Sequence, residues 1–384
     1  MLVFVGLIPV SQFLSVRVIV ITLLLTPFVW NGGHKRLLNR SWDLWLFLLV
    51  LIAGLLYSGN VKAGLKELET SFSFIAIPII LSAVQRIDDN RLLSISRAFM
   101  IGLLITCVVS VTYASYRYLQ SGSTSYFFYY ELTDLMNSHP TYLAYYLIFG
   151  ITACLYTFYY NRTTVASLLP VLMTTVFFFV LILTGGNTAL MSLILVFSFF
   201  ILKYMVEPRT TSKTIIFTSI IVMIVFLFVA SRSGYWMVEG DYWKRSGLWT
   251  SAINANSNPL IGVGTGYDHD VLNEYYLNHG LTHFAEENYN SHNQFIELYL
   301  SNGIIGLVAL LLIIARPMYM SMRSENPLGI LCLFPFIVYG MNEVFLGRYQ
   351  GVVFFVLLHQ LFVIWYKGLK PEVFLKPADR TVPV

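Results

Sequence analysis

Charged residues are scarce in this sequence of 384 residues, where Asp, Glu, Lys and Arg together make up 11%. Soluble globular domains carry about 25% charged residues, so this shortage excludes an ordinary soluble enzyme or binding domain. The net charge is only +4, and we expect no nucleic acid among the partners. Hydrophobic residues take the place of the missing charge and form 57% of the chain.

Cysteine is also rare. Cys107, Cys154 and Cys332 lie in separate apolar runs, with no spacing typical of disulfide frameworks or zinc sites, so we expect three buried thiols. A cleavable signal with a basic start is missing as well, because the chain opens with MLVFVGLIPV. We expect this segment to be part of the mature membrane region, as a short first helix.

Long apolar runs are what the sequence does contain. A helix needs about 20 apolar residues to cross a bilayer, which predicts an all-α, polytopic integral membrane protein with about 11–12 transmembrane helices. Aromatic residues form 16% of the chain, as is typical of rings at lipid–water boundaries. The predicted spans lie near residues 1–13, 15–30, 42–57, 71–84, 97–118, 140–160, 165–184, 187–205, 213–230, 292–315, 327–345 and 349–367.

These spans divide the chain into four parts. We expect residues 1–230 to hold about 8–9 spans, 231–291 to form a long loop, 292–367 to hold the last spans and 368–384 to be a cytoplasmic tail. The loop is rich in Trp and Tyr, so we expect a folded lid of short helices on the membrane face. Its segment DYWKRSGLWTSAI is typical of a short amphipathic helix.

The positions of Lys and Arg predict which loops face the cytoplasm, because cytoplasmic loops carry an excess of these residues. One set of alternate connections holds most of them: Lys35, Arg36, Arg40, Arg86, Arg91, Arg97, Arg162, Lys203, Arg209, Lys213, Arg316, Arg323, Lys367, Lys370, Lys376 and Arg380. The opposite set holds fewer: Lys62, Lys66, Arg232, Lys244, Arg245 and Arg348. The polar segments 121–140, 184–188, 231–291 and 347–351 are therefore predicted to share the non-cytoplasmic face, as in an outer-leaflet active site or a transporter vestibule.

A histidine at the start of a predicted span is the first candidate for catalysis. His292 opens SHNQFIELYLSNGIIGL together with Asn293 and Gln294, which are candidate substrate contacts. An ionisable group at this depth is a functional hypothesis by default, and a neutral imidazole can accept a proton from a sugar hydroxyl. The alternative is a histidine that caps the helix and faces water. Gly303 and Gly306 indicate close helix packing.

Three basic residues are candidates for binding phosphate. Lys244 and Arg245 lie in the aromatic loop, and Arg348 lies in the short connection FLGRYQG. Guanidinium groups bind phosphate with two hydrogen bonds and keep their charge at any working pH. The alternatives are solvated surface charge for the first two residues and an ion pair with Glu343 for Arg348.

Other histidines give weaker signals. His139 and Tyr142, in NSHPTYLAYYL, open another span and are candidates for substrate binding or for an aromatic girdle. His279, His283 and Glu286 have a spacing that a metal could use, but the glutamate that follows the first histidine of a zinc protease helix is missing. We therefore predict no metal site.

Two motifs together resemble the O-antigen ligase family. HNQFIELYLSNGIIG, from His292 to Gly306, is similar to its signature of His-Asn/Ser, about nine residues and Gly-x-x-Gly. RSGLWTSAINANSNPLIGVGTG, from Arg245 to Gly266, is similar to an upstream arginine, tryptophan and Pro-Leu-x-Gly-x-Gly. The signature is shared with O-antigen polymerases and some bacterial oligosaccharyltransferases. The resemblance covers roughly residues 135–365.

The resemblance implies an inverting membrane glycosyltransferase of the GT-C type, with no metal and no cofactor. It would lie in the bacterial inner membrane with its active site facing the periplasm. Its donor would be a glycan on undecaprenyl pyrophosphate, and its acceptor lipid A–core or another glycan. His292 would match the catalytic histidine that activates the acceptor hydroxyl, and Arg245 the arginine that contacts the pyrophosphate.

The sequence departs from the family at one place. Where the family often has Ser-Arg, this chain reads TGGNTAL, with Gly186 and Asn187. We expect Arg348 or Arg232 to supply the missing cation, and Asn187 to remain a candidate substrate contact. A polymerase, a protein oligosaccharyltransferase and, less favoured, a polysaccharide transporter are the alternatives.

Overall fold

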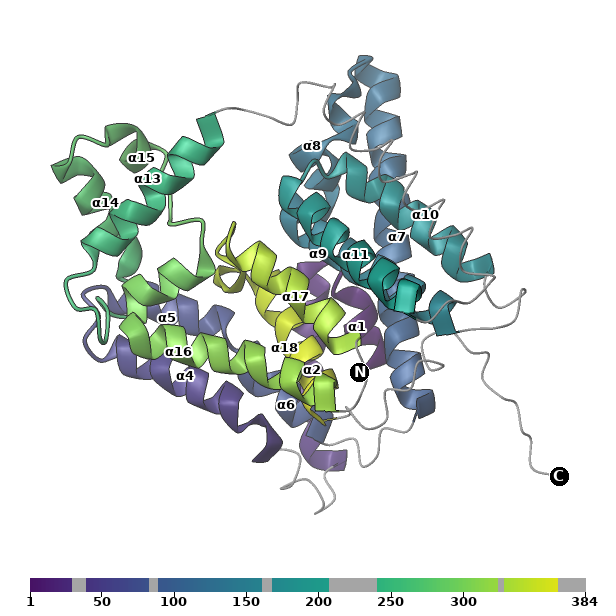
Figure 1. Ribbon diagram of the computed structural model, residues 1–384, viewed down its shortest axis with the longest axis horizontal. Helices are drawn as coiled ribbons and strands as arrows, with labels where there is room; N and C mark the ends of the chain where they lie inside the picture. The colour runs from purple at the N-terminus through teal and green to yellow at the C-terminus, as the bar shows by residue number, and fades with distance from the viewer. Residues whose placement is uncertain (30–38, 83–88, 161–167, 207–239, 324–327, 365–384) are drawn as a thin grey trace.

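The computed structural model describes residues 1–29, 39–82, 89–160, 168–206, 240–323 and 328–364 (Figure 1). Helices form throughout this part of the chain, and it contains no strand, which confirms the all-α prediction. The α-helices are α1 (Leu2–Leu7), α2 (Gln12–Val29), α4 (Trp42–Leu55), α5 (Val61–Thr70), α6 (Ser73–Ser82), α7 (Asp89–Ser121), α8 (Tyr129–Thr133), α9 (Pro140–Tyr160), α10 (Leu168–Leu183), α11 (Asn187–Val206), α13 (Gly240–Ala255), α14 (Asp268–Asn278), α15 (Thr282–Glu286), α16 (Gln294–Arg323), α17 (Leu328–Gly340) and α18 (Tyr349–Ile364).

The helices occur where the apolar runs predict them. Each predicted span within the described residues carries a helix, while the span at 213–230 lies outside them. By length and composition, residues Ser94–Ser121 of α7 and the whole of α16 are long and apolar enough to cross a membrane. The other apolar helices are shorter. The amphipathic helix predicted in the long loop is α13.

Aromatic rings fill the centre of the bundle. The ring of Tyr145 packs against Tyr339, Phe345 and Phe354, with centroid separations of 5.2, 4.9 and 5.3 Å. All four side chains are buried. These contacts join α9, α17 and α18, so they fix the positions of the helix ends around which the polar site forms. The cysteines are free and buried, as predicted.

Helix α16 is broken near its start by Gly303. This residue has φ 64° and ψ −158°, a conformation that is essentially restricted to glycine. The break leaves backbone groups of α16 without partners inside the helix, and the segment 259–264 supplies them. The N–H groups of Val263 and Gly264 donate to the carbonyls of Leu300 and Ser301 (2.9 and 2.8 Å). The break at Gly303 therefore allows α16 to hold a loop, while the nearest neighbours of a Cβ atom on Gly306 would be residues of α16 itself.

Backbone hydrogen bonds also run in the opposite direction, from α16 to the segment 259–264. The N–H groups of Ile304 and Ile305 donate to the carbonyls of Pro259 and Leu260 (2.9 and 3.3 Å). The approach is so close that a Cβ atom on Gly303 would lie 2.3 Å from the carbonyl carbon of Leu260. The NPLIGVGTG segment and the broken helix thus form one unit.

The helices of the long loop form a small body of their own, at the upper left in Figure 1, beside α5 and the start of α16. Its core contains Leu248, Ala252, Leu272 and Tyr276, and Leu300 of α16 joins this core. We call α13, α14 and α15 the lid. Its packing against α16 brings the lid to the end of the bundle where α16 begins.

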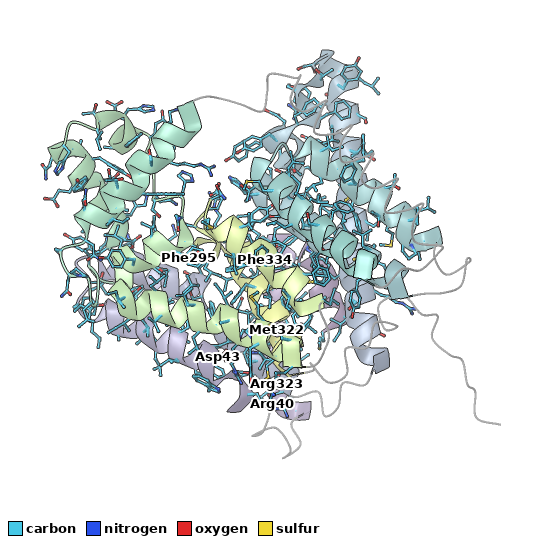
Figure 2. The ribbon with its side chains drawn as sticks, viewed as in Figure 1. Arg40, Asp43, Phe295, Met322, Arg323 and Phe334 are labelled. Atoms are coloured by element: carbon cyan, nitrogen blue, oxygen red, sulfur yellow. The ribbon has the colours of Figure 1, made fainter. Side chains whose placement is uncertain are left out.

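A buried ion cluster lies at the opposite end of α16. Arg316 donates to Asp43, and Nε2 of His359 lies 2.8 Å from the other carboxylate oxygen of Asp43. Asp43 and His359 are fully buried. Figure 2 shows Phe295 near the start of α16, and Arg323 and Asp43 together at its far end. The basic residues at 316 and 323 therefore lie far from the start of the helix.

Candidate functional site

The polar start of α16 is built mainly by helix capping. Asn293 Oδ1 accepts hydrogen bonds from the N–H groups of Phe295 (2.9 Å) and Ile296 (3.2 Å), which would otherwise lack partners in the first turn. Gln294 Oε1 accepts from the N–H of Leu346. Both polar side chains are buried. The side chains of Asn293 and Gln294 thus form hydrogen bonds within the protein, and their contacts with substrate stay predictions.

His292 differs from these neighbours. Its side chain is 30% exposed, and its φ of 46° is unusual for a residue with a large side chain. The conformation is held by its N–H, which donates to Asn290 Oδ1 (2.9 Å). Strained backbone of this kind persists where the surrounding structure enforces it and is common at functional sites. The imidazole thus projects from the helix start toward the connection between α17 and α18.

Glu343 lies in that connection and faces the imidazole. Its Oε2 is 3.4 Å from His292 Nδ1, and its side chain is 29% exposed. A carboxylate at this distance can accept a hydrogen bond from Nδ1–H, which leaves the lone pair of Nε2 available. The ion pair of Glu343 with Arg348, one of the two predictions for that arginine, does not form. Arg348 is exposed and forms no ion pair within the part of the chain that the structure describes.

Arg245 reaches the same connection from the lid. Its Nη1 donates a hydrogen bond to Asn342 Oδ1, next to Glu343 in the chain. Asn293 Nδ2 donates to the carbonyl of Met341 (3.3 Å). The three consecutive residues 341–343 therefore join the start of α16, the lid arginine and the imidazole.

His139 and Tyr142 lie near this cluster, but their polar atoms already form hydrogen bonds within the protein. His139 Nδ1 accepts from the N–H of Thr141 (3.2 Å), and its Nε2 lies 2.6 Å from the hydroxyl of Tyr130. Burial lowers the pKa of His139, Glu343 opposes this shift, and the positive charge of Arg348 adds to it. These influences place Glu343 and Arg348 close to His139. Tyr142 is 5% exposed, and its hydroxyl donates to the carbonyl of Phe345 (3.5 Å).

A pocket opens beside Glu343, between the start of α9, the start of α11 and the end of α17. It has about 280 Å³ of empty space, including the part open to solvent. Its walls include Tyr129, Thr141, Gly186, Thr188, Tyr339 and Glu343. Two of the polar segments that the sequence predicted on one face, 121–140 and 184–188, therefore meet here, and the lid arginine binds Asn342 next to Glu343.

The remaining predicted residues contribute less to this arrangement. Lys244 is exposed on α13. Arg232 lies outside the described residues, and nothing is described of the side chain of Asn187 at the start of α11. The ring of His279 stacks on Tyr275, 3.9 Å between centroids. Within the described ranges, no group of three or more His, Cys, Asp or Glu residues is arranged to hold a metal ion.

Two residues of the site were missed from the sequence, and a third has another partner than the one considered. Asn342 and Tyr339 gave no signal of their own, because a tyrosine and an asparagine at the end of a span are typical of a membrane boundary. Glu343 was noticed, with a different partner. A signal for it did exist, since an acidic residue so near an apolar span needs a cation or a proton donor beside it.

Together the helices and the site define an all-helical protein with apolar helices and a polar site at one end of its long, broken helix. Residues 171–311 match the O-antigen ligase family, which confirms the resemblance seen in the motifs. The matched region contains Arg245, His292 and Gly303. Proteins of this family are membrane proteins.

A curated relative is similar to part of this chain. An uncharacterized protein from Haemophilus influenzae is 26% identical over 135 residues, which cover 31% of this chain and 33% of the relative. The chain thus spans about a third of the length of this curated relative.

Proposed function

We propose that this chain transfers a glycan from undecaprenyl pyrophosphate to lipid A–core at the periplasmic face of the inner membrane, with His292 as general base. The observation that carries the proposal is the arrangement around residues 341–343. There, an exposed and strained histidine faces Glu343 while the lid cation Arg245 binds the adjacent Asn342. The match of this region to the O-antigen ligase family supports it.

The transfer needs a base, an acceptor and a stabilised leaving group. The acceptor oxygen bonds to the anomeric carbon while the bond from that carbon to the phosphate oxygen breaks, which inverts the anomeric centre. The acceptor proton passes to Nε2 of His292, and Glu343 balances the charge on the ring. The electron pair of the broken bond leaves with the undecaprenyl pyrophosphate. Alignment of acceptor and donor supplies much of the remaining rate enhancement.

Arg245 and Arg348 stabilise the negative charge that develops on the leaving pyrophosphate. The side chain of Arg348 is exposed, and its positive charge contributes to the lowered pKa of His139. This supports Arg348 as the replacement for the family arginine that is missing at Gly186. Lys244 and Arg232 are further cations of the same loop. The reaction needs no metal in this proposal.

The membrane arrangement belongs to the same proposal. About 11–12 helices span the inner membrane, in residues 1–230 and 292–367. Residues 231–291 lie in the periplasm, and 368–384 in the cytoplasm. The basic residues at the far end of α16, close to Asp43, agree with this orientation.

Replacement of the base tests the proposal. The variants His292→Ala and His279→Ala are each expressed in the host bacterium after deletion of the gene, and surface glycan is separated on gels. His292→Ala should leave lipid A–core uncapped while lipid-linked polymer accumulates. His279→Ala, which removes a histidine that stacks on Tyr275, should restore capping. The amount of each variant in the membrane is measured by immunoblot.

The same gels separate the competing functions. A cap of one repeat unit in the deletion strain would indicate a polymerase, and unchanged lipopolysaccharide with loss of a protein-linked glycan would indicate protein glycosylation. Normal capping by His292→Ala would remove the histidine from the role of base.

A further inference from the structure

The pocket beside Glu343 has the lining of a site for a neutral, hydroxylated ligand. Among its described lining residues, Glu343 is the one charged side chain, and the rest are aromatic, hydroxyl-bearing or small. An isolated carboxylate repels phosphate, so the pyrophosphate is better placed on the side of Arg245 and Arg348. Carboxylates and hydroxyls accept and donate to sugar hydroxyls, and aromatic rings cover the apolar faces of sugars.

One polar atom in the pocket wall has no partner. Tyr339 is 1% exposed, and its hydroxyl has no hydrogen-bond partner among the described residues. Buried hydroxyls are nearly always bonded, so an orphan hydroxyl in the wall of a pocket indicates a missing ligand group or water. Tyr129, across the pocket, has a φ of 52°, and with His292 it is one of two residues with large side chains at such a φ in the described ranges. Both lie at this site.

The position of the pocket relative to the base decides which sugar it takes. Glu343 lines the pocket and also contacts His292 Nδ1, so a hydroxyl bound at this end lies next to the imidazole. The group that must give its proton to the imidazole is the acceptor hydroxyl. The geometry points to this pocket as the subsite for the terminal sugar of the acceptor, with Tyr339 and Glu343 as its hydrogen-bonding groups. This inference rests on the proposed function and adds the place where the acceptor binds.

Two substitutions test the subsite without removing a protein contact. Tyr339→Phe deletes a hydroxyl that has no partner in the described protein, so folding should be unaffected. Gly186→Leu narrows the pocket, and the site tolerates a side chain because a Cβ atom there meets only Ala189, at 3.6 Å. Gly186 also lies outside the set of residues with positive φ. Gly186→Ala, which adds one methyl group, is its control.

Initial rates are measured with purified protein in detergent, lipid-linked glycan as donor, and lipid A–core from the deletion strain as acceptor. Loss of one hydrogen bond should raise the KM for lipid A–core about fivefold in Tyr339→Phe. Gly186→Leu should raise it more, and Gly186→Ala only slightly. The KM for the donor should stay unchanged in Tyr339→Phe, because this hydroxyl is assigned to the acceptor and the pyrophosphate to Arg245 and Arg348.

Tyr276→Phe is the matched control, since it removes another buried hydroxyl without a described partner, in the lid core away from the pocket. It should leave both KM values unchanged. Transfer by the wild type with an unchanged acceptor KM in Tyr339→Phe and Gly186→Leu would overturn the subsite alone. A rise confined to the donor KM would also overturn it. A wild-type protein that transfers nothing to lipid A–core would refute the proposed function, and the subsite with it.

Discussion

Gly303→Ala should separate the lid from the bundle. The substitution would place a Cβ atom 2.3 Å from the carbonyl carbon of Leu260 and 2.4 Å from its oxygen. Backbone cannot yield locally as a flexible side chain does, so the segment 259–264 must move away. The backbone hydrogen bonds between this segment and residues 300–305 would then break.

The expected loss can be worked out from these contacts. Four backbone hydrogen bonds connect the two segments, and each contributes about 1 kcal/mol. The φ of 64° and ψ of −158° at Gly303 add strain of about 2 kcal/mol for a residue with a side chain. The total is a destabilisation of about 6 kcal/mol if the segment detaches completely, from about 4 for the bonds and about 2 for the strain.

Gly122→Ala is the matched control for strain without collision. Gly122 has a φ of 73°, and a Cβ atom there meets no other atom within 4 Å. Its substitution should cost about 1–2 kcal/mol from the backbone alone. Thermal unfolding in detergent and the rate of proteolysis in the lid are compared for both variants. Equal Tm values and equal lid cleavage would refute the reasoning, because the inserted segment would then contribute nothing.

The remaining predictions concern charge. Arg348→Ala should raise the KM for the lipid-linked donor by about 10- to 100-fold, because it removes a charged hydrogen bond to pyrophosphate. Lys62→Ala, the control, should leave this KM unchanged. An unchanged donor KM in Arg348→Ala would exclude Arg348 as a pyrophosphate contact. Burial, then the neighbouring charge of Asp268, raises the pKa of Glu67 to about 8. The folded protein therefore keeps a proton that the unfolded chain releases above about pH 4.5, so its Tm should fall between about pH 5 and pH 8, and less in Glu67→Gln. A Tm that rises with pH over this range in both proteins would contradict the shift.

Much of the architecture was predictable because it depends on local composition. A run of apolar residues must form its backbone hydrogen bonds within itself wherever water is excluded, so hydropathy alone indicates a helix. This is why apolar helices such as α4, α9 and α16 occur near the predicted spans. The helix α13 was equally readable, because its aromatic and basic residues recur with helical spacing.

Contacts between distant segments were not predictable in this way. An ion pair of Glu343 with Arg348, five residues further along the chain, was one of two alternatives for that arginine, and Glu343 faces His292 instead. The choice between the two partners depends on how the connection after α17 folds over the start of α16. The sequence alone does not show that the connection after α17 lies against the start of α16.

The sequence by itself determined the helical composition, the place of His292 at a helix start, and the two motifs that resemble O-antigen ligases. The tertiary structure decided how the two motifs contact each other. Gly303 breaks α16 so that the glycine-rich segment can form hydrogen bonds with it. Glu343 contacts the imidazole of His292 and also lines the pocket. The physical reason is the distance along the chain between the residues that interact. Helix formation follows from neighbours within a few positions, whereas the partners of a polar group at a helix end depend on the packing of the whole bundle.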